Sequence, residues 1–113
     1  MEAKAIARYI RHSPDKMRKV SNGIYENHAG NISDALSILK LQTTRAARVL
    51  EKVMKSALAN ALKKNMDSKK IRIKFIEISE GPGLKRMRPL GMGRATIIKR
   101  RTSHVKIVLT DEK

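Results

Sequence analysis

The sequence contains no cysteine and no tryptophan, and aromatic residues make up 3% of it. Without cysteine there can be no disulfide, no thiolate chemistry and no cysteine-based zinc site. No apolar run approaches the ~20 residues that a helix needs to span a bilayer, so we expect no membrane insertion. With so few aromatic residues the core must be aliphatic, built from isoleucine, leucine, valine, alanine and methionine.

Side chains that carry catalysis or bind metals are also sparse. His12, His28 and His104 stand apart from one another and from any cluster of acidic residues, so we predict neither a metal site nor a cofactor. Ser103 and His104 are neighbours in a predicted strand and point to opposite faces, which excludes a catalytic pair. The sequence has no Walker-type phosphate loop. We therefore predict that the chain is not an enzyme.

Acidic residues are few, and positive charge is the strongest signal in the composition. The 113 residues include 26 lysines and arginines against 10 aspartates and glutamates, giving a formal net charge of +16. Repulsion among so many positive charges in one small domain favours a polyanionic partner. The sequence pI is near 10.7, and values above about 9 are typical of nucleic-acid binding.

The N-terminal part of the chain predicts a strand followed by a helix. Residues 2–11 alternate in the manner of an edge strand, with Ile6 and Ile10 on one face. The sequence Ser13-Pro14-Asp15 is a strong helix start, because serine caps, proline needs no N–H there and aspartate faces the positive end of the dipole. Gly30 is expected to close this helix. Its inward positions are Met17, Val20 and Ile24.

Two more helices are predicted before the next strand. Ser33 is expected to cap a short one, and the longest begins after Thr43-Thr44 and stops at 63–65, where basic residues meet the negative end of the dipole. Helical spacing is sustained over about five turns of this last helix. The inward positions are Ala35, Leu36, Leu39, Ala46, Ala47, Leu50, Val53, Met54, Ala57, Leu58, Ala61 and Leu62.

Two segments with a period of two predict the sheet. The first contains Ile71, Ile73 and Phe75 ahead of Ile76 and Ile78, and the second contains Val105, Ile107 and Leu109. They are expected to pair as antiparallel strands covered on one face by the helices. We predict an α+β fold in one domain, residues 1–113, with three helices packed on a small antiparallel sheet and a long, protruding basic β-hairpin.

The hairpin is predicted between those strands, at residues 81–104, and the globule from 1–80 and 105–113. No acidic residue occurs from Gly81 to Thr110, while glycine and proline recur. Roughly twelve residues per strand at ~3.3 Å each reach about 40 Å, well beyond a globule with a radius of gyration of ~13 Å. Such an arm suits phosphate contacts on folded RNA, and the scarcity of aromatic residues argues against base stacking as the main mode.

Three groups of residues carry a resemblance to a known family. They are Glu80-Gly81-Pro82, Lys85-Arg86, Pro89, Gly93-Arg94-Ala95, Ile98 and Arg100-Arg101-Thr102-Ser103-His104 in the arm, Ala46-Ala47, Glu51-Lys52-Val53 and Ser56 to Ala61 in the long helix, and Ser13-Pro14, Lys16 and Arg18 at the first helix start. In these residues the sequence resembles the family of large-subunit ribosomal protein twenty-two, of bacterial or organellar type, and the resemblance covers nearly the whole chain. The sequence departs from the family at Asp15, Leu90, Met92 and Ile97, where the family is commonly basic.

The resemblance implies a structural constituent of the large subunit that binds and organises large-subunit rRNA, with its hairpin tip lining the nascent-peptide exit tunnel. The expected rRNA-binding residues are Lys16, Arg18, Lys85, Arg86, Arg88, Arg94, Lys99, Arg100, Arg101 and His104. The expected tunnel-lining residues are Leu84, Lys85, Arg86, Arg88, Pro89, Leu90, Gly91, Met92 and Gly93.

Partners and location follow from the same resemblance. We expect large-subunit rRNA, neighbouring large-subunit ribosomal proteins and the nascent polypeptide as partners, and no homo-oligomer. The sequence from Met1 to Lys4 shows no targeting segment, so the expected location is the ribosome in the cytoplasm, or an organelle interior for an organelle-encoded chain. The alternative is a DNA-bending architectural protein with a basic β-arm, which would normally dimerise around a duplex.

Overall fold

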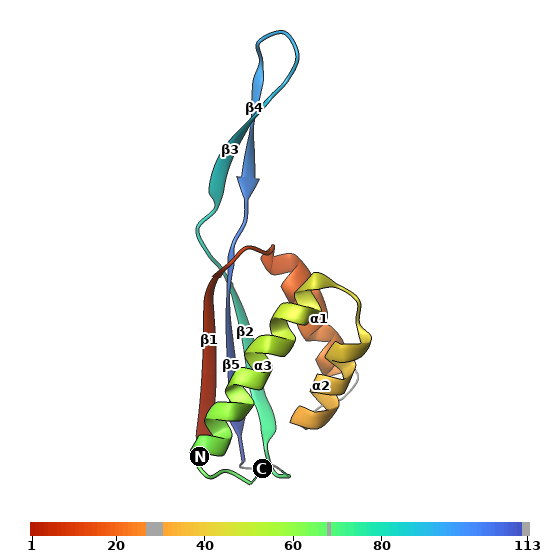
Figure 1. Cartoon of the computed structure of the whole chain (residues 1–113), viewed down its shortest axis with the longest axis vertical. Coiled ribbons are helices and arrows are strands. Elements are labelled where there is room, and N and C mark those ends of the chain that lie inside the picture. The colour runs from red at the N-terminus through yellow and green to blue at the C-terminus, as the bar shows by residue number, and fades with distance from the viewer. Residues whose placement is uncertain (27–30, 68, 112–113) are drawn as a thin grey trace.

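The computed structural model describes residues 1–26, 31–67 and 69–111, which include three helices and five strands (Figure 1). The helices cover one face of a main antiparallel sheet of order β1-β5-β2, while β3 and β4 form a separate antiparallel ribbon, the arm, that projects from the globule. The α+β prediction is confirmed. The elements are β1 (Glu2–Ile10), α1 (Pro14–Glu26), α2 (Ile32–Leu41), α3 (Arg45–Lys63), β2 (Arg72–Glu80), β3 (Leu84–Pro89), β4 (Ala95–Arg100) and β5 (Ser103–Thr110).

The local signals set the starts of α1 and α3. α1 begins at Pro14 as predicted. α3 follows Thr44, whose hydroxyl accepts a hydrogen bond from the Ala47 backbone N–H at 3.4 Å, and it ends at Lys63, in the predicted stop segment. Gly30, the predicted end of α1, and His28 lie outside the described residues.

The start of α2 differs from the prediction. Asn31, not Ser33, precedes the first helical residue, and Ser33 lies inside the helix. The cause is tertiary: Asn31 forms an antiparallel bridge with Arg72 at the start of β2, and Ile32 is buried in the core. Packing against the sheet therefore outweighs the serine cap that the local sequence offers.

The core between helices and sheet is aliphatic, as the composition predicts. All but three of the predicted inward helix positions are buried, and Leu36 and Leu58 are partly buried against the core. Leu62 is the exception, with 49% of its surface exposed. It follows the fully buried Ala61, and successive residues project about 100° apart around a helix, so Leu62 points away from the sheet.

β1 is an edge strand, as predicted, but its faces are not those expected. Ala5 is buried against the helices, whereas Ile6 is 45% exposed on the open face. The register with β5 shifts between Ala7 and Ile10, and Tyr9 has a positive φ of 58°. This bulge turns Ile10 toward the core, so the prediction that Ile6 and Ile10 share a face is wrong.

A second register shift, between Ile73 and Phe75, changes the faces of β2. Phe75 is turned outward and is 37% exposed, while Ile76 and Ile78 pack against the core. β5 lies between β1 and β2 and contributes the fully buried side chains of Val105, Ile107 and Leu109.

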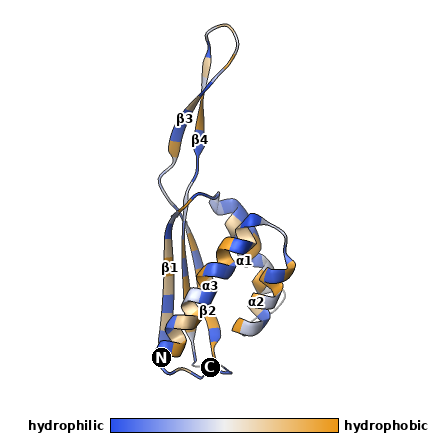
Figure 2. Cartoon of the chain, viewed as in Figure 1, coloured by the Kyte–Doolittle hydropathy of each residue, from blue (hydrophilic) through white to orange (hydrophobic). Residues whose placement is uncertain are grey.

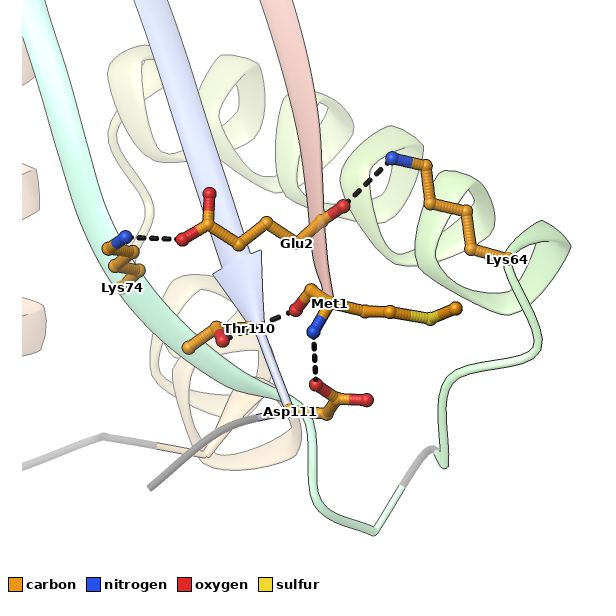
Figure 3. Close-up of polar contacts among 6 residues, drawn as sticks. All are labelled: Met1, Glu2, Lys64, Lys74, Thr110 and Asp111. Atoms are coloured by element: carbon orange, nitrogen blue, oxygen red, sulfur yellow. Dashed lines mark hydrogen bonds and ion pairs between the residues drawn. The ribbon is translucent and has the colours of Figure 1, made fainter.

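The end of the main sheet opposite the arm is closed by polar contacts (Figure 3). The Met1 α-ammonium lies 3.1 Å from Asp111 Oδ1, and Lys64 Nζ donates to the backbone carbonyl of Glu2 at 2.8 Å. The Glu2 carboxylate pairs with Lys74, and this hydrogen bond lowers the pKa of Glu2. These contacts join β1 to β5, β2 and the end of α3.

The arm makes the molecule long. Its extents are 63 × 24 × 17 Å and its radius of gyration is 17.0 Å, compared with ~13 Å for a compact domain of about 100 residues. The protruding hairpin is therefore confirmed.

Candidate nucleic-acid interface

The arm is a regular antiparallel ribbon closed by a tight tip. Leu84 pairs with Arg100 at its base, and Pro89 pairs with Ala95 near its tip. The turn is closed by a 2.6 Å hydrogen bond from the Leu90 N–H to the Arg94 carbonyl. Hydrophilic and hydrophobic residues are mixed along both strands (Figure 2). Because the ribbon has no core of its own, its side chains are available to a partner.

The register divides the arm into two faces that differ in charge. Directly paired residues of an antiparallel ladder share a face, and successive residues alternate. One face, the arginine face, carries Leu84, Arg86, Arg88, Thr96, Ile98 and Arg100. The other carries Lys85, Met87, Pro89, Ala95, Ile97 and Lys99. The arginines of the two strands therefore lie together on one side of the ribbon.

The base of the arm is held to the globule by closely packed backbone. The Gly81 N–H donates to the Thr102 carbonyl at 2.9 Å, and the Thr102 hydroxyl donates to the Pro82 carbonyl at 2.6 Å. A Cβ on Gly81 would lie 2.5 Å from Thr102 Oγ1 and 3.1 Å from His104 Nε2. Only glycine leaves room for this approach. The junction thereby sets the direction in which the arm leaves the sheet.

A concave surface, the basic hollow, lies where this arm base meets the starts of α1 and α3. Its volume is about 740 Å³. It joins side chains from the end of β1, the first turns of two helices and the lower part of the arm. The lining residues are Arg11, His12, Ser13, Lys16, Arg45, Leu84, Arg86, Lys99, Arg100, Arg101 and Thr102.

The cations of the basic hollow are mostly uncompensated. Asp15 lies 3.6 Å from Arg101 and 3.7 Å from Arg18, and among the described residues no acidic group pairs with the other lysines and arginines of the hollow. Lys16 and Arg45 also stand in the first turns of α1 and α3, where a cation opposes the helix dipole. Such an arrangement destabilises the free protein and is relieved by a bound anion.

His12 reports the electrostatic character of the hollow. Its pKa is lowered, first by burial and then by the neighbouring cations Arg45 and Lys16. The imidazole therefore stays neutral at a pH where a free histidine begins to take up a proton. An anion that neutralised these two cations would make His12 easier to protonate.

The structure brings together only part of the predicted rRNA-binding set. Lys16, Arg86, Lys99, Arg100 and Arg101 line the basic hollow. Outside it, Lys85, Arg88 and Arg94 are exposed along the arm. Arg18 pairs with Asp15 and donates to the Ile78 carbonyl at 3.1 Å, and His104 Nδ1 accepts the Tyr9 N–H at 3.0 Å. Both of these side chains therefore already have partners within the protein.

Sequence reasoning missed five residues of the hollow as site residues: Arg11, His12, Ser13, Arg45 and Thr102. The signal for Arg45 was a cation in the first turn of a helix, a position where it costs stability. For Arg11 and His12 the signal was weaker, because they merely precede a helix start.

Within residues 1–26, 31–67 and 69–111 there is no metal-binding cluster of acids, histidines or cysteines, and no helix there is long and apolar enough to cross a membrane.

These features define a structural protein that binds nucleic acid: a projecting basic ribbon, a hollow of mostly unpaired cations and a small α+β globule. The family model of Ribosomal protein L22p/L17e matches residues 5–110, and the chain belongs to this family. It is therefore a non-enzymatic ribosomal protein with rRNA and other ribosomal proteins as its partners. The alternative of a DNA-bending architectural protein is not supported.

Relatives match over the full length of the chain. The large ribosomal subunit protein uL22 of Desulforamulus reducens is 48% identical, covering 100% of this chain and 98% of the relative. The proteins of the same name from Staphylococcus haemolyticus and Clostridioides difficile are 46% and 43% identical, each over 100% of this chain and over 95% and 100% of the relative.

Proposed function

We propose that this ribosomal protein is a structural constituent of the large subunit that binds and organises large-subunit rRNA, with the tip of its arm lining the peptide exit tunnel. The observation that carries the RNA-binding part is the basic hollow, which continues onto the arginine face of the arm. The large-subunit names of the relatives support the assignment to that subunit.

The basic hollow is the anchor in this proposal. Lys16, Arg45 and Arg100 reach it from three separate elements, so a folded RNA backbone seated there would hold the arm base and both helix starts together. Arginine suits this role because its planar fork makes paired hydrogen bonds to phosphate. Arg86 and Arg88 extend the contact along the arm. Arg18 and His104, which have partners within the protein, contribute by supporting the neighbouring backbone.

The chain works in this proposal as one domain, with a globule of residues 1–80 and 105–113 and an arm of about 81–104. The globule docks on rRNA and neighbouring large-subunit proteins, and it does so as a monomer. The ribosome in the cytoplasm is the proposed location, with an organelle interior as the equivalent place for an organelle-encoded chain.

The tip carries the tunnel-lining role. Met92 is fully exposed and Leu90 is 51% exposed, while Met92 and Gly93 have positive φ values of 63° and 72° that fold the chain back tightly. A narrow tip of this kind enters a confined space, and its small and apolar side chains suit contact with a passing polypeptide. The nascent chain is thus the proposed partner of the outer part of the predicted stretch 84–93, since Leu84 and Arg86 lie toward the arm base and line the basic hollow.

A photo-crosslinking amino acid tests the tip assignment. Placed at Met92 in ribosomes carrying a stalled nascent chain, it should crosslink to that chain. The matched control is the same group at exposed Lys69, in the loop between α3 and β2 at the end opposite the arm. If no position from 84 to 93 crosslinks, or if Lys69 crosslinks equally, the tip does not line the tunnel.

A further inference from the structure

Tyr9 combines exposure with a backbone conformation that aromatic residues rarely adopt. Its φ is 58° and 64% of its surface is exposed. For a bulky L-residue this left-handed region is strained, and such strain gathers at functional sites. Burial of the ring cannot account for it, because the ring remains largely in solvent. The bulge that contains Tyr9 lies on an edge strand, and such bulges often re-aim a side chain.

The ring is nevertheless held in place. The Tyr9 N–H donates to His104 Nδ1 at 3.0 Å, and the two rings meet edge to face with centroids 4.9 Å apart and planes at 90°. His104 in turn lies against Gly81 at the base of the arm. Tyr9 of β1 is therefore held by His104 of β5, which itself lies at the arm junction. The orientation of the Tyr9 ring is set before any partner binds.

The surroundings of Tyr9 are cationic. Arg8 precedes it and is exposed, and Arg11, two residues further on, is exposed and lines the basic hollow. Phe75 is also an exposed aromatic ring, but the Lys106 ammonium lies over it at 6.0 Å from the ring centroid. An RNA backbone that leaves the hollow along Arg11 would carry its next bases past Tyr9.

We propose that the Tyr9 ring is a stacking platform for one unpaired nucleobase of the rRNA. This inference rests on the proposed RNA-binding function. It adds one base-stacking contact, although the low aromatic content of the chain argues against stacking as the main mode of binding. A ring already fixed by His104 loses little conformational freedom on binding, so stacking on it is favoured over stacking on a mobile side chain. Arg11, which lines the basic hollow, would contact the phosphate next to that base.

Two substitutions separate stacking from folding. Tyr9→Phe keeps a ring of the same shape, whereas Tyr9→Gly removes the ring and adopts the positive φ without strain. With a large-subunit rRNA transcript as the probe, Tyr9→Phe should bind like the unaltered protein. Tyr9→Gly should keep its thermal stability and bind about 5- to 150-fold more weakly, the range for losing one stacked base. Its salt dependence should not change, because stacking releases no counterions.

Fluorescence gives an independent measurement in the intact chain. The protein has two tyrosines and no tryptophan, so a Tyr25→Phe variant reports on Tyr9 alone, and stacking should quench its emission when the transcript binds. The stacking proposal would be overturned if Tyr9→Gly bound the transcript with unchanged affinity, or if Tyr9 emission did not respond to RNA. Either result would also be expected if a protein, and not a nucleobase, covers the ring. If variants of Arg45 and Arg100 still bound the transcript more weakly, the proposal that the hollow binds RNA would stand without the stacking proposal. If the unaltered protein bound no RNA, the RNA-binding proposal and the stacking proposal would both fail.

Discussion

Replacing Arg45 and Arg100 together with glutamine should flatten the salt dependence of rRNA binding. Both side chains are exposed, both line the basic hollow and neither pairs with an acidic group among the described residues. Each phosphate neutralised contributes ~0.7 to ~0.9 to the log–log slope of affinity against salt concentration. If each arginine neutralises one phosphate, the slope should fall by about 1.4 to 1.8.

The assay is a titration of an rRNA transcript at several salt concentrations. Between ~50 and ~200 mM salt, a slope difference of this size makes the unaltered protein lose about tenfold more affinity than the double variant. Thermal unfolding of both proteins in the absence of RNA checks that the variant is folded. Removing repulsion in the hollow should leave its stability equal or slightly higher.

The matched control is Lys69→Gln with Lys70→Gln. It removes the same charge from two exposed residues at the end of the molecule opposite the arm (Figure 1). Its slope should change by less than about 0.5, since its lysines neutralise no phosphate in the hollow. If the control flattened the slope as much as the hollow variant, net charge alone would explain binding and the hollow would have no special role. An unchanged slope for the hollow variant would also refute it.

Three further predictions concern the arm, its junction with the globule and the basic hollow. In the first, residues 86–98 are replaced with an Asn-Gly turn, which joins Lys85 to its register partner Lys99. The midpoint of thermal unfolding should be nearly unchanged, and a loss of folding would show that the arm supports the globule. Gly81→Ala should destabilise the protein by about 1 to 3 kcal/mol in denaturant unfolding, because the new methyl group would meet Thr102. Gly91→Ala, where nothing lies within 4 Å, is its neutral control. Neighbouring cations help to lower the pKa of His12, so a bound phosphate that neutralises them should raise this pKa. The affinity for rRNA should then increase as pH falls from about 7.5 to 5.5, by up to about tenfold per unit of pKa change. His12→Gln should lose this increase, and a variant with the same pH profile as the unaltered protein would contradict the prediction.

Most of the fold follows from local patterns. The helix starts at Pro14 and Arg45 were predictable because the caps and dipole act within one turn. The faces of the edge strands were not, since single-residue register shifts reverse the side on which Ile10 and Phe75 lie. These shifts depend on pairing with β5, which is distant in sequence.

The site was predictable only in part for a similar reason. Charge composition identified the arm, and the cationic residues of β3 and β4 needed no tertiary information. The basic hollow instead depends on α1 and α3 starting side by side with the arm base, which brings in Arg11 and Arg45. The backbone groups that bond Arg18 and His104, the Ile78 carbonyl and the Tyr9 N–H, also belong to elements far away in the chain. Alternation alone could not show that these side chains are already engaged.

Co-sedimentation with large ribosomal subunits in a moderate-salt gradient tests the central claim most directly. The unaltered protein should migrate with the large subunit, and the Arg45→Gln, Arg100→Gln variant should be released at a lower salt concentration than the Lys69→Gln, Lys70→Gln control. A protein that stayed at the top of the gradient while binding duplex DNA as a dimer would contradict the account.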